Sequence, residues 1–256
     1  MRVAVTRLFV AATVILSLLP GALRAADRPP NVIFFLVDDL GWRDLGCYGS
    51  SFYETPHIDR FAKQGVRFTQ AYATCHVCSP TRASIMTGKY PARLQLTDWL
   101  PGRREFPFQK FKNAKIHQHL PLQEVTIAEA LKVHGYRTAH IGKWHLGEDP
   151  FGPLDQGFDI QVPRWNKGWP RAGYHAPFQL DGIENVEGEY LTDRLTDVAE
   201  RFIETNKDQP FFLYMSHFAV HDPIQGRKDL VEKYQQKLDS QRRRRGPAFI
   251  LEGNPD

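Results

Sequence analysis

The sequence predicts an α/β fold in which a central, mostly parallel or mixed sheet is flanked by helices. Two short segments, residues 31–37 and 211–215, are almost wholly apolar, as strands buried inside a sheet are. Helical patterns alternate with strand patterns along the chain, which is typical of a sheet covered by helices. Hydrophobic residues make up 42% of the chain and charged residues 24%, which excludes a disordered or membrane-spanning class.

The first 26 residues predict an export signal. Arg2 and Arg7 give a positively charged start, residues 8–19 are mainly apolar, and Ala25 and Ala26 offer a cleavage site. A transmembrane anchor is the less favoured alternative, because the apolar run is short for a bilayer span. We therefore expect the export machinery to deliver the mature chain, residues 27–256, to the periplasm or outside the cell, without a stable membrane anchor.

The first strand, residues 31–37, is expected at the centre of the sheet with both faces buried. Asp38 and Asp39 follow it directly, at the carboxyl end where open α/β sheets place their active sites. A helix is predicted from Thr55 to Gly65, with Thr55 as N-cap and Gly65 as the stop.

A second helix is expected to start just after Cys78, and a third to span residues 125–133. The third leads into a strand at 138–141, and an amphipathic helix at 189–205 precedes the apolar strand at 211–215.

Two segments fall outside this alternation. Residues 100–119 are basic and aromatic without a period, which predicts a surface insertion near the site that shapes selectivity. Residues 242–245 are four consecutive arginines, interpreted as a solvated turn, with a contact to polyanions as the less favoured alternative.

The strongest chemical signal is the segment that begins at Cys78. This cysteine stands directly before an expected helix start, where the helix dipole and free N–H groups favour an anion. Arg82 can present a fork of donors to a tetrahedral oxyanion. Taken alone, Cys78 is better explained as a structural cysteine beside an ordinary helix cap.

Three further motifs carry candidate site residues. Asp38 and Asp39 offer hard carboxylate oxygens, which suit Ca²⁺ or Mg²⁺. In the motif at residues 142–147, alternation places Lys143 and His145 on one side of an extended segment and turns Trp144 into the core. The motif at 217–223 contains two histidines. Taken singly, Asp38 and Asp39 are also explained by a solvated turn, and the motif at 142–147 by a surface lysine and a core histidine.

Together these motifs resemble the formylglycine-dependent sulfatases, the arylsulfatase-like family of the alkaline phosphatase superfamily. The residues from Cys78 to Arg82 match the Cys-x-Pro-x-Arg sequence that the family's maturation enzyme recognises, and residues 87–91 match the trailing part. The resemblance runs from about Asn31 to the end of the sequence. It implies an alkaline-phosphatase-like fold and the conversion of Cys78 to formylglycine.

The resemblance also implies a metal centre and roles for the remaining motifs. One divalent ion, Ca²⁺ or Mg²⁺, is expected on Asp38, Asp39 and the modified Cys78. Modified Cys78 is the expected nucleophile, and it is supported by a set of catalytic residues. These are Arg82, which stabilises charge, Lys143 and His221, which hold the sulfate and protonate the leaving oxygen, and His145, which assists proton transfer. His217 is expected to be structural.

The match ends soon after His221. The later Asp–Asn pair and the further lysine of the family have no counterpart there, so residues 27–256 are predicted to form an incomplete catalytic domain that lacks its C-terminal portion. An inactive or unstable fragment is one alternative. A phosphate or phosphonate ester hydrolase and a non-catalytic protein that binds sulfated glycans are the others.

The expected partners are a sulfated small molecule or glycan and the maturation enzyme, and no nucleic acid. Aryl, glycosaminoglycan and algal polysaccharide sulfates remain open as substrates. The pairing of Cys47 with Cys75 also remains open.

Overall fold

The computed structural model describes residues 28–245 of the 256. The predicted export signal lies outside these residues. The chain divides into two units, Met1–Asn31 and Val32–Asp256, and every element below belongs to the second. Within the described part, none of the helices has both the length and the apolar character needed to cross a bilayer.

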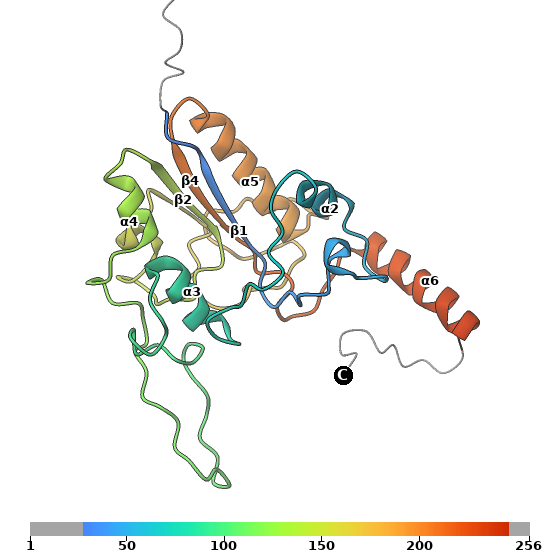
Figure 1. Cartoon of the computed structure of the whole chain (residues 1–256), viewed down its shortest axis with the longest axis horizontal. Helices are drawn as coiled ribbons and strands as arrows, with labels where there is room; N and C mark the ends of the chain where they lie inside the picture. Colours follow the sequence, from blue (N-terminus) through green and yellow to red (C-terminus); the bar gives the residue numbers. More distant parts are fainter. Residues whose placement is uncertain (1–27, 246–256) are drawn as a thin grey trace, which may run out of the picture. The chain divides into compact units, whose positions relative to one another are not determined.

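The core is a four-stranded sheet with the order β1-β4-β2-β3 (Figure 1). The strands are β1 (Val32–Leu36), β2 (Arg137–Gly142), β3 (Ile160–Val162) and β4 (Phe211–Ser216). All three neighbouring pairs are parallel. This arrangement confirms the predicted α/β fold and its parallel sheet, and it brings the carboxyl ends of β1, β4 and β2 to one edge.

The α-helices of residues 28–245 are α2 (Pro56–Ala62), α3 (Cys78–Thr87), α4 (Ile127–Lys132), α5 (Leu191–Asn206) and α6 (Lys228–Arg245). Four of these five α-helices, α2 to α5, begin and end close to predicted positions. The first helix ends three residues before Gly65, so its predicted stop is wrong. Thr55 is its N-cap residue, but its side chain makes no capping bond: its hydroxyl oxygen accepts from the backbone N–H of Gly46, and its proton is donated to Asp59.

Helix α4 is held by a capping box. The hydroxyl of Thr126 accepts a hydrogen bond from the backbone of Glu129, whose carboxylate accepts one from the backbone of Thr126 in return. The two contacts satisfy donors that the helix start leaves free. They explain why a helix of only six residues begins at a defined position.

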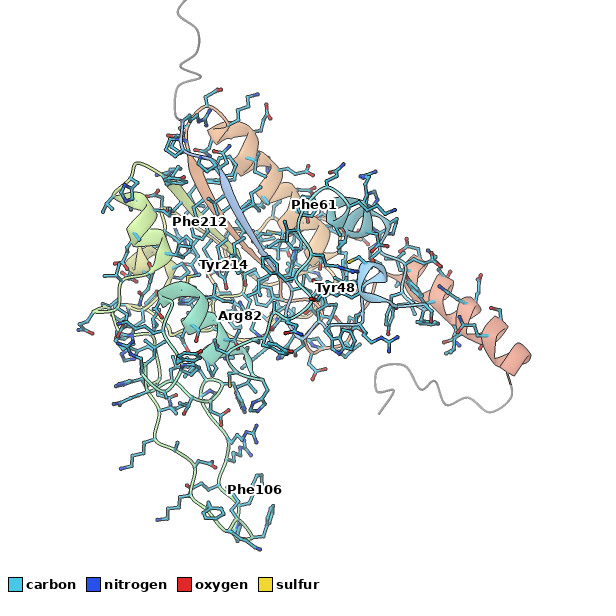
Figure 2. All side chains as sticks on the ribbon, viewed as in Figure 1. Tyr48, Phe61, Arg82, Phe106, Phe212 and Tyr214 are labelled. Atoms are coloured by element: carbon cyan, nitrogen blue, oxygen red, sulfur yellow. The ribbon has the colours of Figure 1, made fainter. Side chains whose placement is uncertain are left out.

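Strand β4 separates two apolar clusters. Its odd-numbered residues, 211, 213 and 215, face a cluster that includes the apolar side of α5. Phe212 and Tyr214 face the opposite cluster, which includes residues of α3 and α4 (Figure 2). All six residues of β4 are buried. Helices on both faces of a parallel strand account for the unbroken apolar pattern of this segment.

The predicted place of the first strand is wrong. Among the described strands β1 lies at an edge of the sheet, with β4 as its one neighbour. The side chains of Ile33 and Phe35 are 51% and 60% exposed, while Val32, Phe34 and Leu36 pack toward α3 and α4. An apolar run reports that both faces of a strand are apolar, and it does not report that both are covered.

The sequence patterns missed one strand and one α-helix, as well as two short 3-10 helices at Gly46–Tyr48 and Pro153–Gln156. Strand β3 has three residues, too few to show an alternation. Helix α6 has few apolar residues, so it offers no amphipathic stripe to recognise. Residues 242–245 belong to this helix, so the turn predicted for the four arginines is wrong.

Candidate active site

The ends of three strands build the candidate site. Asp38 follows β1, Lys143 follows β2, and Ser216 is the last residue of β4. Backbone hydrogen bonds join the strands beyond their regular ends: Lys143 N donates to Ser216 O at 2.7 Å, and Asp38 N donates to Ala219 O at 2.9 Å. The carboxyl edge of the sheet therefore fixes the main chain beneath these side chains.

The junction between β2 and the site requires a glycine. Gly142 has a φ of 113°, and a Cβ atom there would lie 1.8 Å from the carbonyl oxygen of Ser216. Any side chain would separate β2 from β4 at the point where Lys143 leaves the strand. This close approach gives a physical reason for glycine at the start of the motif at residues 142–147.

A buried group of three charges forms the floor of the site. The Asp38 carboxylate pairs with Arg82 (Nη2 to Oδ1, 3.2 Å) and with the Lys143 ammonium, and all three side chains are almost fully buried. Burial by itself raises the pKa of Asp38, but the charges of Arg82 and Lys143 outweigh it and lower that pKa. Burial, and then the charge of Arg82, lowers the pKa of Lys143. One carboxylate thus faces two cations, which leaves a local excess of positive charge suited to an anion.

Ser216 connects these cations to the main chain. Its hydroxyl donates to the Lys143 carbonyl at 2.9 Å and accepts a hydrogen bond from Nη1 of Arg82. The same Nη1 also donates to the Lys143 carbonyl at 2.7 Å. The guanidinium of α3 is therefore tied to the ends of both β2 and β4.

Cys78 is the first residue of α3, and its side chain faces His145. The distance from Cys78 Sγ to His145 Nδ1 is 3.1 Å, and the other ring nitrogen, Nε2, lies 2.8 Å from the Leu100 carbonyl oxygen. Because a carbonyl only accepts, Nε2 carries the proton, and the lone pair of Nδ1 points at the thiol. Burial and the nearby charge of Lys143 lower the pKa of His145 to about 3, which keeps the ring neutral at pH 7.

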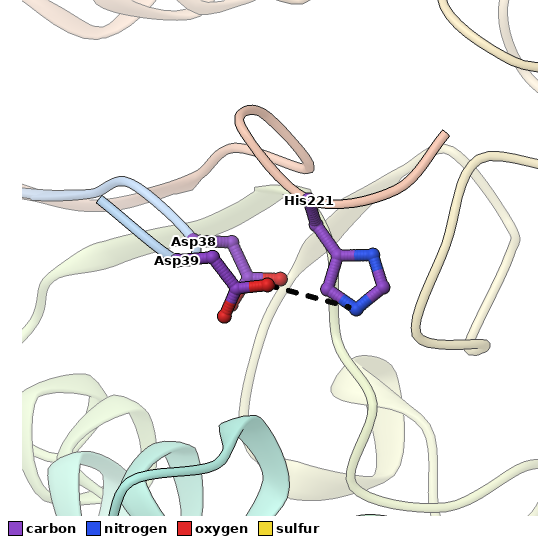
Figure 3. A group of neighbouring side chains, drawn as sticks. All are labelled: Asp38, Asp39 and His221. Atoms are coloured by element: carbon purple, nitrogen blue, oxygen red, sulfur yellow. Dashed lines mark ion pairs between the residues drawn. The ribbon is translucent and has the colours of Figure 1, made fainter. Parts of the chain in front are cut away.

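The second half of the site is more open. Asp38, Asp39 and His221 each offer one ligand atom, and these atoms all lie within 4.8 Å of one another (Figure 3). Nε2 of His221 lies 3.9 Å from Oδ2 of Asp39. The Tyr174 hydroxyl donates to the His221 carbonyl oxygen at 2.9 Å, which ties this loop to the core.

The donor set of this cluster fits a divalent cation. Two carboxylates are hard ligands of the kind that Ca²⁺ and Mg²⁺ prefer, and an imidazole nitrogen is the third donor. Asp39 has a φ of 56°, a left-handed conformation that aspartate tolerates and that recurs at functional sites. The structure groups His221 with the two aspartates, and Cys78 is not part of that group.

A cavity of about 330 Å³ opens beside His145. His145, Asn166, Lys167 and Trp169 contribute to its lining, together with the ends of the loop at 100–118. The cavity combines the aromatic ring of Trp169 with the amide of Asn166 and the charge of Lys167, as small-molecule sites do.

Sequence reasoning missed several residues that hold these groups in place. They are Ser216, the Leu100 carbonyl, Gly168 and Tyr174. A serine at a strand end or a tyrosine in a loop has no pattern that distinguishes it from its neighbours. All three cysteines, Cys47, Cys75 and Cys78, are free thiols in the structure.

The fold and the site define an α/β protein with two buried cations at the carboxyl edge of a parallel sheet, beside a cysteine at a helix start. Comparison with known proteins gives the family. The sulfatase family profile matches residues 30–246, so this chain belongs to the sulfatase family.

Relatives with assigned names agree with this family. The chain is 35% identical to the mouse (Mus musculus) N-acetylgalactosamine-6-sulfatase over 219 residues, which cover 78% of this chain and 41% of that protein. It is 40% identical to human (Homo sapiens) arylsulfatase A, covering 78% of this chain and 43% of the relative. The chain thus spans less than half the length of either protein.

A solved structure shares the fold of this chain. The structure of Ps i-CgsB in complex with k-i-k-neocarrahexaose superimposes with a TM-score of 0.66 at 30% identity, covering 81% of this chain and 49% of that one.

Proposed function

We propose that this chain carries the sulfate-handling part of a sulfatase that hydrolyses sulfate esters of carbohydrates, with Cys78, converted to formylglycine, as its nucleophile. The observation that carries the proposal is the contact of Cys78 Sγ with the neutral His145 Nδ1 at 3.1 Å, beside the buried cations Arg82 and Lys143. The sulfur atom occupies the place that an oxygen of the modified side chain would take.

The chain's own residues account for the steps around sulfur. The hydrated aldehyde supplies two hydroxyls on one carbon, one to attack sulfur and expel the alcohol, the other to lose its proton so that the carbon–oxygen bond to sulfate breaks. His145 Nδ1 accepts that proton, because Nε2 is already engaged by Leu100. Arg82 and Lys143 offset negative charge on the sulfate oxygens. His221 is the proposed donor to the leaving oxygen.

Asp38 and Asp39 would hold a divalent cation, Ca²⁺ or Mg²⁺, with His221 beside them. Such an ion supplies positive charge that stabilises the nucleophile and the developing oxyanion. Arg82 and Lys143, which both contact Asp38, already supply part of that positive charge.

Carbohydrate is the favoured substrate class. The first relative is named for an action on N-acetylgalactosamine 6-sulfate groups, and the solved structure above contains a carrageenan oligosaccharide. In this chain the cavity beside His145 offers the Trp169 ring together with polar groups of Gln118 and Asn166. An aromatic ring for a sugar face and amides for its hydroxyls suit a carbohydrate.

The first test is a peptide mass spectrum across Cys78 after co-expression with a formylglycine-generating enzyme. Conversion lowers the mass of the residue by roughly 18 Da, and hydration restores it, so an aldehyde-reactive probe is used in parallel. Cys75→Ala is the matched control, because it removes the neighbouring thiol and leaves the recognised sequence intact. An unmodified Cys78 in a host that converts a known sulfatase would exclude this nucleophile.

The second test compares turnover of a sulfate ester with turnover of the matching phosphate ester. Turnover of 4-nitrophenyl sulfate that exceeds turnover of 4-nitrophenyl phosphate, and that disappears in Cys78→Ala, supports a sulfatase. The reverse preference supports a phosphate ester hydrolase.

Export to the periplasm or the medium belongs to the same proposal. Fractionation of expressing cells and N-terminal sequencing are expected to find the chain outside the cytosol, starting near Asp27. A cytosolic chain that retains Met1 would contradict export.

A further inference from the structure

The loop between α3 and α4 extends away from the sheet (Figure 1). Residues 103–115 form its outer part, called here the basic arm, and Phe106 lies near its tip (Figure 2). Two contacts of Asn113 hold the two limbs of the arm together: its side-chain amide donates to the Arg103 carbonyl at 2.9 Å, and its backbone N–H donates to Glu105 at 3.2 Å. These bonds hold residues 103–105 against residue 113.

The arm carries the net charge of the whole chain. It contains five basic residues and one acidic residue, Glu105, which gives a formal charge of +4, equal to that of the entire sequence. Outside the arm, basic and acidic residues balance. The basic residues, all exposed, are Arg103, Arg104, Lys110, Lys112 and Lys115. A local charge of this size attracts a polyanion at moderate ionic strength.

Exposed aromatic rings lie among these charges. Phe106, Phe108 and Phe111 are 51%, 81% and 85% exposed, and the first two stack with their ring centroids 5.3 Å apart. Single exposed apolar side chains are common, but a group of three on one loop indicates a contact surface. Rings between cations suit a partner that has both apolar faces and negative groups.

The base of the arm is part of the candidate active site. Pro101 and Gln118, just outside the two ends of the arm, line the cavity beside His145. At the same end, Nη2 of Arg103 lies 3.2 Å from His76 Nε2, two residues before Cys78. A molecule that occupies the cavity and continues outward would therefore meet the arm.

We propose that the basic arm binds the chain of a sulfated polysaccharide beyond the sugar held at the site, with its lysines and arginines on sulfate groups and its phenylalanines on sugar faces. The inference rests on the proposed function for the place of the reacting sugar. A polysaccharide fits better than an anionic membrane, because the charges run from the base of the arm to its outer part, whereas docking to a bilayer needs them at the tip.

Binding to dextran sulfate tests this directly, with uncharged dextran of the same length as the reference polymer. The double variant Lys110→Gln/Lys112→Gln is expected to bind dextran sulfate on the order of tenfold more weakly at low salt. Each lysine near an anionic surface strengthens binding, and the variant loses both contributions. The pair Lys63→Gln/Arg201→Gln removes the same charge from exposed positions, one just after α2 and one on α5, and is expected to change affinity by less than about twofold. Equal effects of the two pairs would overturn the proposal.

The aromatic part has its own test. Phe108→Ser/Phe111→Ser keeps every charge, and because both rings are exposed, the circular dichroism spectrum and the melting temperature should not change. Affinity for dextran sulfate is expected to fall roughly fivefold. An unchanged affinity would contradict a contact between these rings and the sugar chain.

Two further measurements separate this inference from its alternatives. Vesicles of phosphatidylcholine with phosphatidylserine should not bind, and arm-dependent vesicle binding without dextran sulfate binding would overturn the proposal in favour of a membrane. Turnover of 4-nitrophenyl sulfate should be the same in wild type and arm variants. If wild type shows no turnover but the arm variants lose dextran sulfate binding, the proposed function fails and the binding surface stands.

Discussion

Asp38 and Asp39 are neighbours in the sequence with the same carboxylate, yet their surroundings differ sharply. Asp38 has a side chain that is only 6% exposed and lies between Arg82 and Lys143. Asp39 is 57% exposed, and its Oδ2 lies 3.9 Å from Nε2 of His221. The site therefore has a buried half, made of Asp38, Arg82 and Lys143 with Cys78 and His145 beside them, and an exposed half, made of Asp39 and His221.

The difference in exposure between Asp38 and Asp39 shows which part of the site is held in place by the fold. The buried half is fixed by packing, by charge pairs of low exposure and by hydrogen bonds to strand ends. The exposed half depends on two short loops, joined where Val220 N donates to the Asp38 carbonyl at 2.7 Å. Substitutions in the buried half should therefore change stability, and those in the exposed half should change ligand binding.

The largest effect is expected from Asp38→Asn. This change leaves Arg82 and Lys143 buried without a counter-charge, and removing one partner of a buried pair costs about 3–5 kcal/mol of unfolding free energy. Asp39→Asn is the matched control, because asparagine tolerates the left-handed φ of 56° and the side chain is exposed. Its expected cost is within about 0.5 kcal/mol.

Urea unfolding of both variants at pH 7 checks this difference. Added Ca²⁺ should raise the melting temperature of the wild type and should do so less in either variant, because both remove a candidate ligand. Equal losses of stability in the two variants would remove the distinction between the halves.

A second test uses pH. Burial lowers the pKa of His217 to about 4, and its ring packs against Phe35 with centroids 4.6 Å apart. In the unfolded chain the same group titrates near 6.5, so as pH falls from about 6.5 to 4 the unfolded state binds a proton that the folded state does not. Stability is therefore expected to fall over this range, by at most about 1.4 kcal/mol per pH unit for this histidine.

His217→Phe should remove that contribution to the slope. Because His140 and His145 are also buried with pKa values of about 3, a slope from those two remains. Urea unfolding at pH 7, 6, 5 and 4 gives the slopes. If the unfolding free energies of wild type and variant change in parallel with pH, His217 takes up its proton over the same pH range in the folded and unfolded states.

Gly168 tests whether His145 is held by packing. A Cβ at residue 168 would lie 2.4 Å from Cε1 of His145, so Gly168→Ala must displace the imidazole or the backbone at residue 168. Overpacking of this kind costs about 1–3 kcal/mol. At Gly65 the nearest atom to such a Cβ, the Phe61 carbonyl oxygen, is 3.8 Å away, so Gly65→Ala should be neutral within about 0.5 kcal/mol. Thermal unfolding of the two alanine variants measures the contrast, and an equally mild effect at residue 168 would mean that the ring is free to shift.

How much of this site the sequence predicts depends on the kind of signal. The apolar strands and the residues that follow them could be found, because runs of apolar residues report strands and parallel strands place their ends together. Trp144 is fully buried, as the alternation at residues 143–145 predicts. His145, however, has a φ of 57°, so the segment is not a simple extended strand, and Lys143 and His145 reach different partners.

Other features had no signal of their own in the sequence. Whether a strand is central or lies at an edge depends on its neighbours, so the apolar residues of β1 could not reveal the exposure of Ile33 and Phe35. Grouping His221 with two aspartates needs the backbone bond between the two loops, which links residues far apart along the chain. Ser216 gains its role only from the atoms around it.

Ser216 gives the smallest effect and the finest test of the buried half. Ser216→Ala removes the hydroxyl that donates to the Lys143 carbonyl at 2.9 Å and accepts from Arg82, while Nη1 of Arg82 keeps its own bond to that carbonyl. One donor is thus lost and the carbonyl stays satisfied, so the expected cost is about 1 kcal/mol.

Ser84 is a buried control from α3. Its side-chain oxygen is buried and has no hydrogen-bond partner within residues 28–245, so Ser84→Ala should be neutral or slightly stabilising. Urea unfolding of the two alanine variants compares a bonded with an unbonded buried hydroxyl of the same residue type. If Ser216→Ala is as mild as Ser84→Ala, the buried half is held by its charges and packing alone, and Ser216 does not position Arg82.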